Sequence, residues 1–287
     1  MSDQIVGGNR NAGVAEGFEF EEPPECRVVI YNDDFTEKGF VVEILMQVFH
    51  KSEPNAVVIV ATIRALKQHG GIALEDLKEE NVEAMLAGCE NLAKHIDTVQ
   101  QFGLPYIVAI NEFATDTPAE VAALEKWCEE NNHPMSLSQV WAKGGEGGVE
   151  LANKVVEACE KPSAFKPLYS LDLTLKEKVE KIAKEIYGAS KVNYTTAAEK
   201  AIKEVVALGG DKLPICVAKT QYSLSDDPTK LGAPKGFEIT VRDVTISNGA
   251  GFAVIYTGNI MTMPGLPKVP AAEKINIDEN GKISGLF

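Results

Sequence analysis

The sequence predicts an α/β protein, with a region of parallel strands and helices followed by a smaller, strand-rich α/β domain at the C-terminus. Two continuous apolar runs, Val57–Ala61 and Tyr106–Ile110, have the composition of strands buried on both faces, as parallel strands are. Between and after them, apolar residues recur at helical spacing. From Phe237 onward, short apolar strands separated by turn residues replace this pattern. A short β-α segment is expected ahead of the first run.

The individual elements follow from local signals along the chain. A helix is expected within Leu74–Gln101. Another should begin at Thr117, where the threonine can cap it, Pro118 suits its first turn and Glu120 can complete a capping box. The inner face of this helix is marked by Val121, Leu124 and Cys128. Further helices are expected at 149–160, 175–187 and 196–208, and further strands at 215–218, 237–241 and 252–256.

Composition excludes several classes of protein. The 287 residues carry 28 Lys and Arg against 42 Asp and Glu, a net charge of −14, which disfavours binding to nucleic acid or to anionic membranes. The longest apolar runs are shorter than the roughly 20 residues of a spanning helix, and no signal peptide begins the chain, so we expect a cytoplasmic protein. The five cysteines and four histidines lack the spacing of a metal site or a disulfide framework, so no metal ligand is expected.

Two stretches have the features of a ligand site. In Trp141–Gly148, four glycines lie beside a tryptophan and Lys143 just before a helix, so the backbone there can approach an anion closely. A flexible surface turn is the alternative, and the glycines alone favour it. In Asn111–Thr117, Phe113 follows a predicted parallel strand at the end where α/β sheets bind ligands, and its ring can stack on a flat heterocycle. A phenylalanine that plugs the sheet end is an equal alternative.

Two further stretches carry basic side chains after predicted strands. Lys219 and Thr220 stand with other hydroxyl residues after strand 215–218, where they could hold a carboxylate or a phosphate; a polar loop is the alternative. Arg64 and Lys67 follow Val57–Ala61 and could face the phosphates of a nucleotide. From the residues alone we expect the charges of Arg64 and Lys67 to be exposed to solvent.

In this order, the four stretches resemble the C-terminal half of the formate–tetrahydrofolate ligase family (10-formyltetrahydrofolate synthetases), from about Pro54 to Phe287. Segments Asp243–Phe252 and Gly258–Pro267 resemble the closing part of that family. The resemblance implies that ATP phosphorylates formate and that N10 of tetrahydrofolate attacks the formyl phosphate, which gives 10-formyltetrahydrofolate, ADP and phosphate. It also implies a homo-oligomer and ATP bound with Mg²⁺, and it leaves a monovalent cation open.

The resemblance further implies roles for single residues. Phe113 and Trp141 would sandwich the pterin ring of the folate. The nucleotide side would consist of Arg64, Lys67, Lys143, Gly144, Gly145, Glu146 and Gly147. Other contacts to the substrates would come from Asn111, Asp116, Lys219 and Thr220. The chain departs from the family in one respect, because no G-x-x-x-x-G-K-[ST] sequence occurs in it. Phosphoryl transfer depends on such a loop and on Mg²⁺, so no catalytic residue is assigned and the sequence does not predict catalysis by this chain alone.

The segment 26–56 resembles the opening strand and first helix of ClpS-type adaptors, which deliver proteins with bulky N-terminal residues to an AAA+ protease. The resemblance implies that Asn32 and Asp33 contact the α-amino group of a degron, with Asp34 completing the motif. The likeness ends before the second helix of that domain. We therefore expect a disordered tail (1–25), a partial adaptor segment (26–56), a remnant of the nucleotide-binding domain (57–100), a folate and nucleotide side (101–228) and a strand-rich domain (229–287).

Three functions follow as hypotheses: the ligase, the adaptor, and a non-catalytic remnant that assembles with a full ligase subunit. The junction near residues 54–57 would remove the strands that flank Val57–Ala61 in the ligase sheet. An exposed apolar sheet edge is therefore expected there, and such an edge favours oligomerisation.

Overall fold

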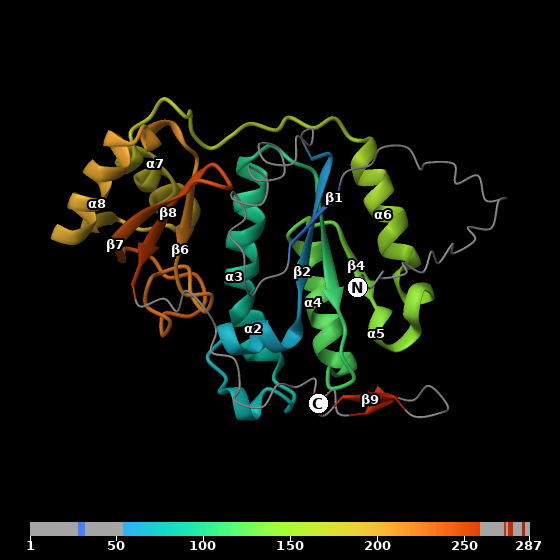
Figure 1. Ribbon diagram of the computed structural model, residues 1–287. Coiled ribbons are helices and arrows are strands. Elements are labelled where there is room, and N and C mark those ends of the chain that lie inside the picture. Colours follow the sequence, from blue (N-terminus) through green and yellow to red (C-terminus); the bar gives the residue numbers. More distant parts are fainter. Residues whose placement is uncertain (1–27, 32–53, 259–272, 274, 278–282, 285–287) are drawn as a thin grey trace, which may run out of the picture.

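Figure 1 shows a computed structural model of the chain, which describes residues 28–31, 54–258, 273, 275–277 and 283–284. Two four-stranded sheets with flanking helices confirm the predicted α/β class. The first sheet contains, in spatial order, β1 (Val28–Tyr31), β2 (Ala56–Ala61), β3 (Tyr106–Asn111) and β4 (Met135–Ser138). Every neighbouring pair of strands in it is parallel, as the two apolar runs predicted.

Strand β1 corrects the expectation of an exposed sheet edge. It pairs with β2 from Val28 opposite Ala56 to Tyr31 opposite Ile59, while β3 pairs along the other side of β2. The apolar run at Val57–Ala61 therefore has a neighbour on both sides, and the expected open edge beside it is wrong. The sequence did not reveal this pairing, because a short strand carries no mark of the strand it will join.

The helices cover both faces of the first sheet. Helices α2 (Ile63–His69), α3 (Val82–Gln101) and α4 (Pro118–Glu130) form the larger core with one face, and α6 (Val149–Glu160) packs on the other. Figure 1 shows α3 and α6 on opposite sides of the strands. The larger core includes Val57, Ile59, Val108, Ile110, Met85, Leu92, Ile96, Leu124 and Cys128, and the smaller one Ala56, Ile107 and Ala158. Strand residues therefore alternate between the two faces.

Helix α4 begins with the predicted capping box. The hydroxyl Oγ1 of Thr117 accepts a hydrogen bond from the N–H of Glu120 at 3.3 Å, and Oε2 of Glu120 accepts one from the N–H of Thr117 at 3.1 Å. Val121, Leu124 and Cys128 are buried, as their spacing predicted. The loop between β3 and α4 therefore ends at a fixed point of the fold.

The second sheet is mixed, in the order β5 (Lys191–Tyr194), β7 (Glu238–Ser247), β8 (Phe252–Thr257) and β6 (Ile215–Ala218). Helices α7 (Leu175–Lys181), continued by a π-helical turn (Ile182–Tyr187), and α8 (Thr196–Ala207) pack against it. Apart from β5, which was not predicted, these elements confirm the helices and strands predicted from 175 onward. The sheet also joins β5 and β6 to strands beyond residue 228, so it spans the domain boundary expected there. The domain limits themselves stay predictions.

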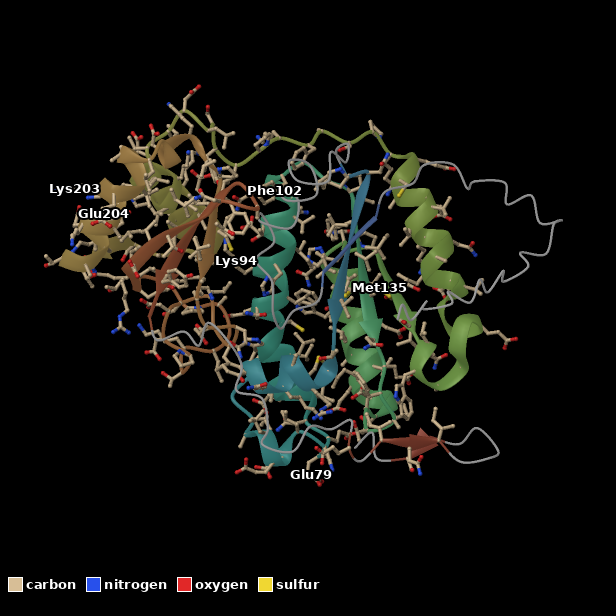
Figure 2. All side chains as sticks on the ribbon, in the orientation of Figure 1. Glu79, Lys94, Phe102, Met135, Lys203 and Glu204 are labelled. Atoms are coloured by element: carbon tan, nitrogen blue, oxygen red, sulfur yellow. The ribbon has the colours of Figure 1, made fainter. Side chains whose placement is uncertain are left out.

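Hydrogen bonds join the part of the chain that contains the second sheet to helices α2 and α3. The side chain of Asn91 donates to the carbonyl of Gly232 at 2.8 Å, and the N–H of Gly232 donates to Nδ1 of His69 at 3.1 Å. The ammonium of Lys94, labelled on α3 in Figure 2, donates to the carbonyl of Glu185 at 3.2 Å. Helix α3 therefore stands between the two sheets (Figure 1).

Several expectations lie outside the described residues: the tail at 1–25, the adaptor motif at Asn32, Asp33 and Asp34, and residues 259–267 of the closing segment. Beyond residue 272, two short strands pair antiparallel, β9 (Asn276–Ile277) and β10 (Ile283–Ser284). Within the part of the chain that the structure describes, no helix is both long and apolar enough to cross a membrane.

Candidate functional site

The carboxyl ends of β3 and β4 lie side by side, because Asn111 pairs with Ser138 at the last step of the parallel ladder. The loop Glu112–Thr117 follows β3, and the segment Gln139–Gly148 follows β4. This is the edge at which open α/β sheets bind ligands. Two of the four stretches that the sequence singled out are therefore neighbours in the fold.

A chain of hydrogen bonds joins these two loops. The amide Nε2 of Gln139 donates to Oε2 of Glu112 at 2.6 Å, and the ammonium of Lys143 donates to Oε1 of Gln139, also at 2.6 Å. The N–H of Glu112 donates to the carbonyl of Ser138 at 3.1 Å. Phe113 follows Glu112 directly, and Trp141 stands two residues after Gln139. The Glu112–Gln139 bond therefore fixes the two aromatic-bearing loops relative to each other.

The glycine segment has a regular backbone conformation in the structure. It forms a single helical turn α5 (Val140–Lys143) followed by a 3₁₀ helix (Gly144–Gly148) that leads into α6. Gly144 has φ 60° and ψ −146°, a conformation that only glycine adopts without strain. A Cβ on Gly147 would lie 2.4 Å from the carbonyl oxygen of Gln139, so the two backbones touch. Around Gly144 and Gly145 the space is open.

The two aromatic side chains differ in exposure. Trp141 is 68% exposed, which is unusual for the largest apolar side chain. Phe113 is half-buried and does not belong to the hydrophobic residues that pack against the larger core. This argues against the alternative in which Phe113 plugs the end of the sheet. Both rings are therefore available to a flat ligand.

A cavity of about 450 Å³ opens beside this edge, between the sheet and α6. Its apolar walls come from Val58, Val60, Ala109, Leu151 and Val155, and its polar end from Asn111 and Ser138. Val140 and Gly148 of the glycine segment also border it. The size is that of a pocket for a small heterocyclic ligand. Sequence reasoning found Asn111 but missed Ser138, because β4 is short and was not predicted as a strand.

Asp116 has a buried carboxylate oxygen without a hydrogen-bond partner. Its Oδ2 accepts the N–H of Phe113 at 2.8 Å, whereas Oδ1 has no partner. Burial raises the pKa of this carboxyl, and the bond from the Phe113 N–H offsets the effect only in part. Oδ1 is therefore a buried acceptor whose hydrogen-bonding capacity is unused within the described residues.

We expect Asp116→Asn to raise the free energy of unfolding at pH 7, by on the order of 0.5 kcal/mol, as partly exposed positions allow. The pKa of Asp116 is raised in the folded state, so its ionised form opposes folding, and this cost grows as pH rises through the folded pKa. Urea unfolding at pH 7 and below pH 4 measures the effect, which should vanish in acid. Asp172→Asn, at an exposed position, is the control. A less stable Asp116→Asn chain at pH 7 contradicts the argument.

Arg64 and Lys67 have different environments on α2. Arg64 is exposed, as expected. Lys67 is 1% exposed, and its ammonium lies 2.9 Å from Oε1 of the buried Glu120 and donates to the carbonyl of Glu79, also at 2.9 Å. Figure 2 labels Glu79 at the lower edge of the molecule. The expectation of a solvated charge is therefore wrong for Lys67, since α4 covers it, and this arrangement offers no ammonium to a phosphate.

Lys219 and Thr220 lie after β6, in the second sheet, and not at the edge formed by β3 and β4. The ammonium of Lys219 donates to the carbonyls of Thr220 and Ser223 and lies 5.0 Å from the centre of the Tyr187 ring. These contacts fit the alternative of a polar loop, in which Lys219 donates hydrogen bonds to carbonyl groups of the same loop. Their role in substrate binding stays a prediction.

Metal ligands were not expected among the histidines and cysteines. The described residues contain no group of three or more His, Cys, Asp or Glu side chains arranged to hold a metal ion. Cys89 and Cys128 are buried, and burial raises the pKa of each thiol to about 12, so both remain protonated.

Comparison with known proteins identifies the family. The family model for formate–tetrahydrofolate ligase matches residues 31–287. The chain is 55% identical over 235 residues to the formate–tetrahydrofolate ligases of Staphylococcus aureus strains Newman and MRSA252, a match that covers 82% of this chain. It spans 42% of the length of each of these relatives.

The family match begins at residue 31 and so includes most of the segment 26–56 that was compared with ClpS-type adaptors. The adaptor likeness stays a prediction. From residue 54 onward, the match coincides with the resemblance that the four motifs indicated. On these findings, the chain belongs to the formate–tetrahydrofolate ligase family.

Proposed function

We propose that this chain holds the folate and the nucleotide in the ATP-dependent ligation of formate to tetrahydrofolate, which gives 10-formyltetrahydrofolate. One observation carries the proposal. The 2.6 Å hydrogen bond between Glu112 and Gln139 ties the loop of Phe113 to the loop of Trp141, next to the glycine segment and the 450 Å³ cavity. The aromatic side chains that would bind a flat ring system and the glycine segment that would bind a phosphate chain thus lie at one edge of the sheet.

Each group in this arrangement has a chemical task. The rings of Phe113 and Trp141 stack on the pterin and orient it, which lowers the entropic cost of bringing two reactants together. The open space around Gly144 and Gly145 admits phosphates to the backbone, and Lys143 supplies a positive charge beside them.

The phosphate chain of ATP fits the open glycine segment, and Mg²⁺, when bound, neutralises charge on the transferring phosphoryl group. The chain contains no G-x-x-x-x-G-K-[ST] sequence, so we expect binding without turnover when it is assayed alone. The readout is 10-formyltetrahydrofolate formed from ATP, formate and tetrahydrofolate, converted by acid to the absorbing methenyl form. A monovalent cation, a homo-oligomer and a cytoplasmic location remain predictions of the same resemblance and composition.

Thermal protection by 5-formyltetrahydrofolate tests the folate side. We expect the ligand to raise the Tm of the parent chain, and Trp141→Ala to need about tenfold more ligand for the same shift, since an aromatic stacking partner is lost. The matched control is Trp127→Phe, because the only other tryptophan packs against His133 at 5.3 Å. Equal protection of the parent and Trp141→Ala removes Trp141 from the folate site.

The two other functions are kept as sequence-based hypotheses. Binding of degrons would rest on Asn32, Asp33 and Asp34, which lie outside the described residues. Fluorescent peptides that begin with Phe or Leu test it, and an absence of saturable binding at micromolar concentration removes it. Assembly with a full-length ligase subunit would appear as co-purification of the two chains.

A further inference from the structure

At the candidate site, the side chain of Gln139 lies between two charged side chains. The Lys143 ammonium only donates hydrogen bonds and the Glu112 carboxylate accepts them, so the amide must present Oε1 to the lysine and Nε2 to the glutamate. Both contacts are 2.6 Å long. The glutamine therefore has one orientation, and each of its ends is matched to a charge.

The backbone of Gln139 is held as firmly as its side chain. Its N–H donates to the carbonyl of Gly147 at 3.0 Å, and its carbonyl accepts from the N–H groups of Ala142 at 3.1 Å and Lys143 at 2.9 Å. The backbone that carries this side chain is thus hydrogen-bonded into the glycine segment. Any shift of Gln139 would move both Lys143 and the glycines.

The neutral amide also has an electrostatic consequence. A carboxylate in direct contact with an ammonium neutralises it, and their attraction falls with distance. Here the amide is inserted between the two, so Lys143 is oriented by a polar group without forming an ion pair with Glu112. The ammonium keeps its positive charge for another anion.

We propose that Gln139 is a positioning residue, which fixes the Lys143 ammonium beside the glycine segment and keeps it from pairing with Glu112, so that it binds an anionic group of the nucleotide. This inference rests on the proposed function of the same site. Gln139 itself touches no reacting atom in this role and acts through Lys143.

An exchange of the two partners separates this role from a purely structural one. In Glu112→Gln/Gln139→Glu, the new amide at 112 donates to the new carboxylate at 139, which accepts from Lys143, so both hydrogen bonds persist. Lys143 is now in direct contact with a carboxylate. The exchange therefore keeps the two hydrogen bonds but removes the amide that separates the Lys143 ammonium from the carboxylate.

The experiment is a titration with ATP and Mg²⁺ at low ionic strength, followed by the fluorescence of Trp141 in a Trp127→Phe background. We expect Gln139→Leu, Lys143→Met and the exchange each to weaken binding about tenfold, the size of one charge-assisted hydrogen bond. The exchange should retain the emission wavelength of Trp141 and the urea midpoint of the parent. Added to Lys143→Met, it should cause no further loss of affinity. Lys200→Met, at an 80% exposed position on α8, is the control and should bind like the parent.

The outcomes distinguish the two proposals. If the parent chain binds ATP and the exchange variant binds equally well, the spacing role of Gln139 is refuted while the nucleotide site stands. If Gln139→Leu also binds like the parent, the whole chain of hydrogen bonds is irrelevant to the ligand. If the parent shows no saturable binding, the nucleotide side of the proposed function fails, and the inference about Gln139 fails with it.

Discussion

Replacing Lys67 by methionine should lower the free energy of unfolding by about 3–5 kcal/mol, the cost of leaving one partner of a buried ion pair alone. The side chains of Lys67 and Glu120 are 1% and 0% exposed, and their charged atoms lie 2.9 Å apart. Methionine has nearly the volume of lysine, so the change removes the charge and leaves little cavity. The loss is therefore electrostatic.

The position of the pair in the fold explains the size of this effect. Besides Lys67, the Glu120 carboxylate accepts the N–H of Asn81 at 2.8 Å and the N–H of Thr117 at 3.1 Å, while Lys67 also holds the carbonyl of Glu79. The pair thus connects α2, the start of α3 and the start of α4. Through Thr117 it also fixes the end of the loop that carries Phe113.

The pH dependence of stability follows from the same contacts. Burial works against ionisation of Glu120, but the N–H of Asn81, the ammonium of Lys67 and the N–H of Thr117 outweigh it and lower its pKa. A carboxyl whose pKa is lowered by folding stabilises above its unfolded value, and this contribution is lost as pH falls through the folded pKa. The difference between Lys67→Met and the parent should therefore be largest at neutral pH and shrink below about pH 4.

Urea unfolding at several pH values measures this difference. The double variant Lys67→Met/Glu120→Gln should recover much of the lost stability, because no charge remains buried. The control is Lys126→Met, which breaks the exposed pair between Lys126 and Glu130 on α4 and should cost less than about 1 kcal/mol. A loss for Lys67→Met no larger than that of this control would show that the buried pair does not stabilise the fold.

Lys67 also shows where sequence reasoning ends. The capping box of α4 was predictable because its partners lie three residues apart, and Thr117 and Glu120 form it as expected. The partner of Lys67 is the same Glu120, 53 positions further along, and no local pattern connects the two. A lysine after a strand has the composition of a solvated charge until the helix that covers it is known.

The candidate site divides in the same way. Phe113, Trp141 and the glycines are recognisable as motifs, and the structure places their loops at adjacent strand ends. Gln139, which joins them, carries no signal, because a single glutamine after an unpredicted four-residue strand resembles any loop residue. The strands β4 and β5 were missed for the same reason, since their existence depends on the neighbours with which they pair. A strand was expected near β1, but its pairing with β2 was not.

Replacing Gly147 by alanine should weaken ATP binding about tenfold, the loss of one charge-assisted hydrogen bond that follows when Lys143 is displaced from the ligand. A Cβ at this position would lie 2.4 Å from the carbonyl oxygen of Gln139 and 2.5 Å from its carbonyl carbon, so the backbones must separate. The separation breaks the bond from the Gln139 N–H to the Gly147 carbonyl and moves Lys143 with it. Global stability should change little, because the segment is largely exposed.

The neighbouring glycine supplies the matched control for this prediction. A Cβ on Gly145 meets no atom within 4 Å and its φ is not positive, so Gly145→Ala should bind ATP within about twofold of the parent. The two variants add the same methyl group two residues apart in one segment. Titration with ATP and Mg²⁺ and urea unfolding of both chains separate a local effect on the ligand from a general one on folding. Equal affinities for the two alanine variants would mean that the contact between Gly147 and Gln139 does not shape the site, whereas a selective loss at Gly147 ties ligand binding to the backbone that positions Lys143.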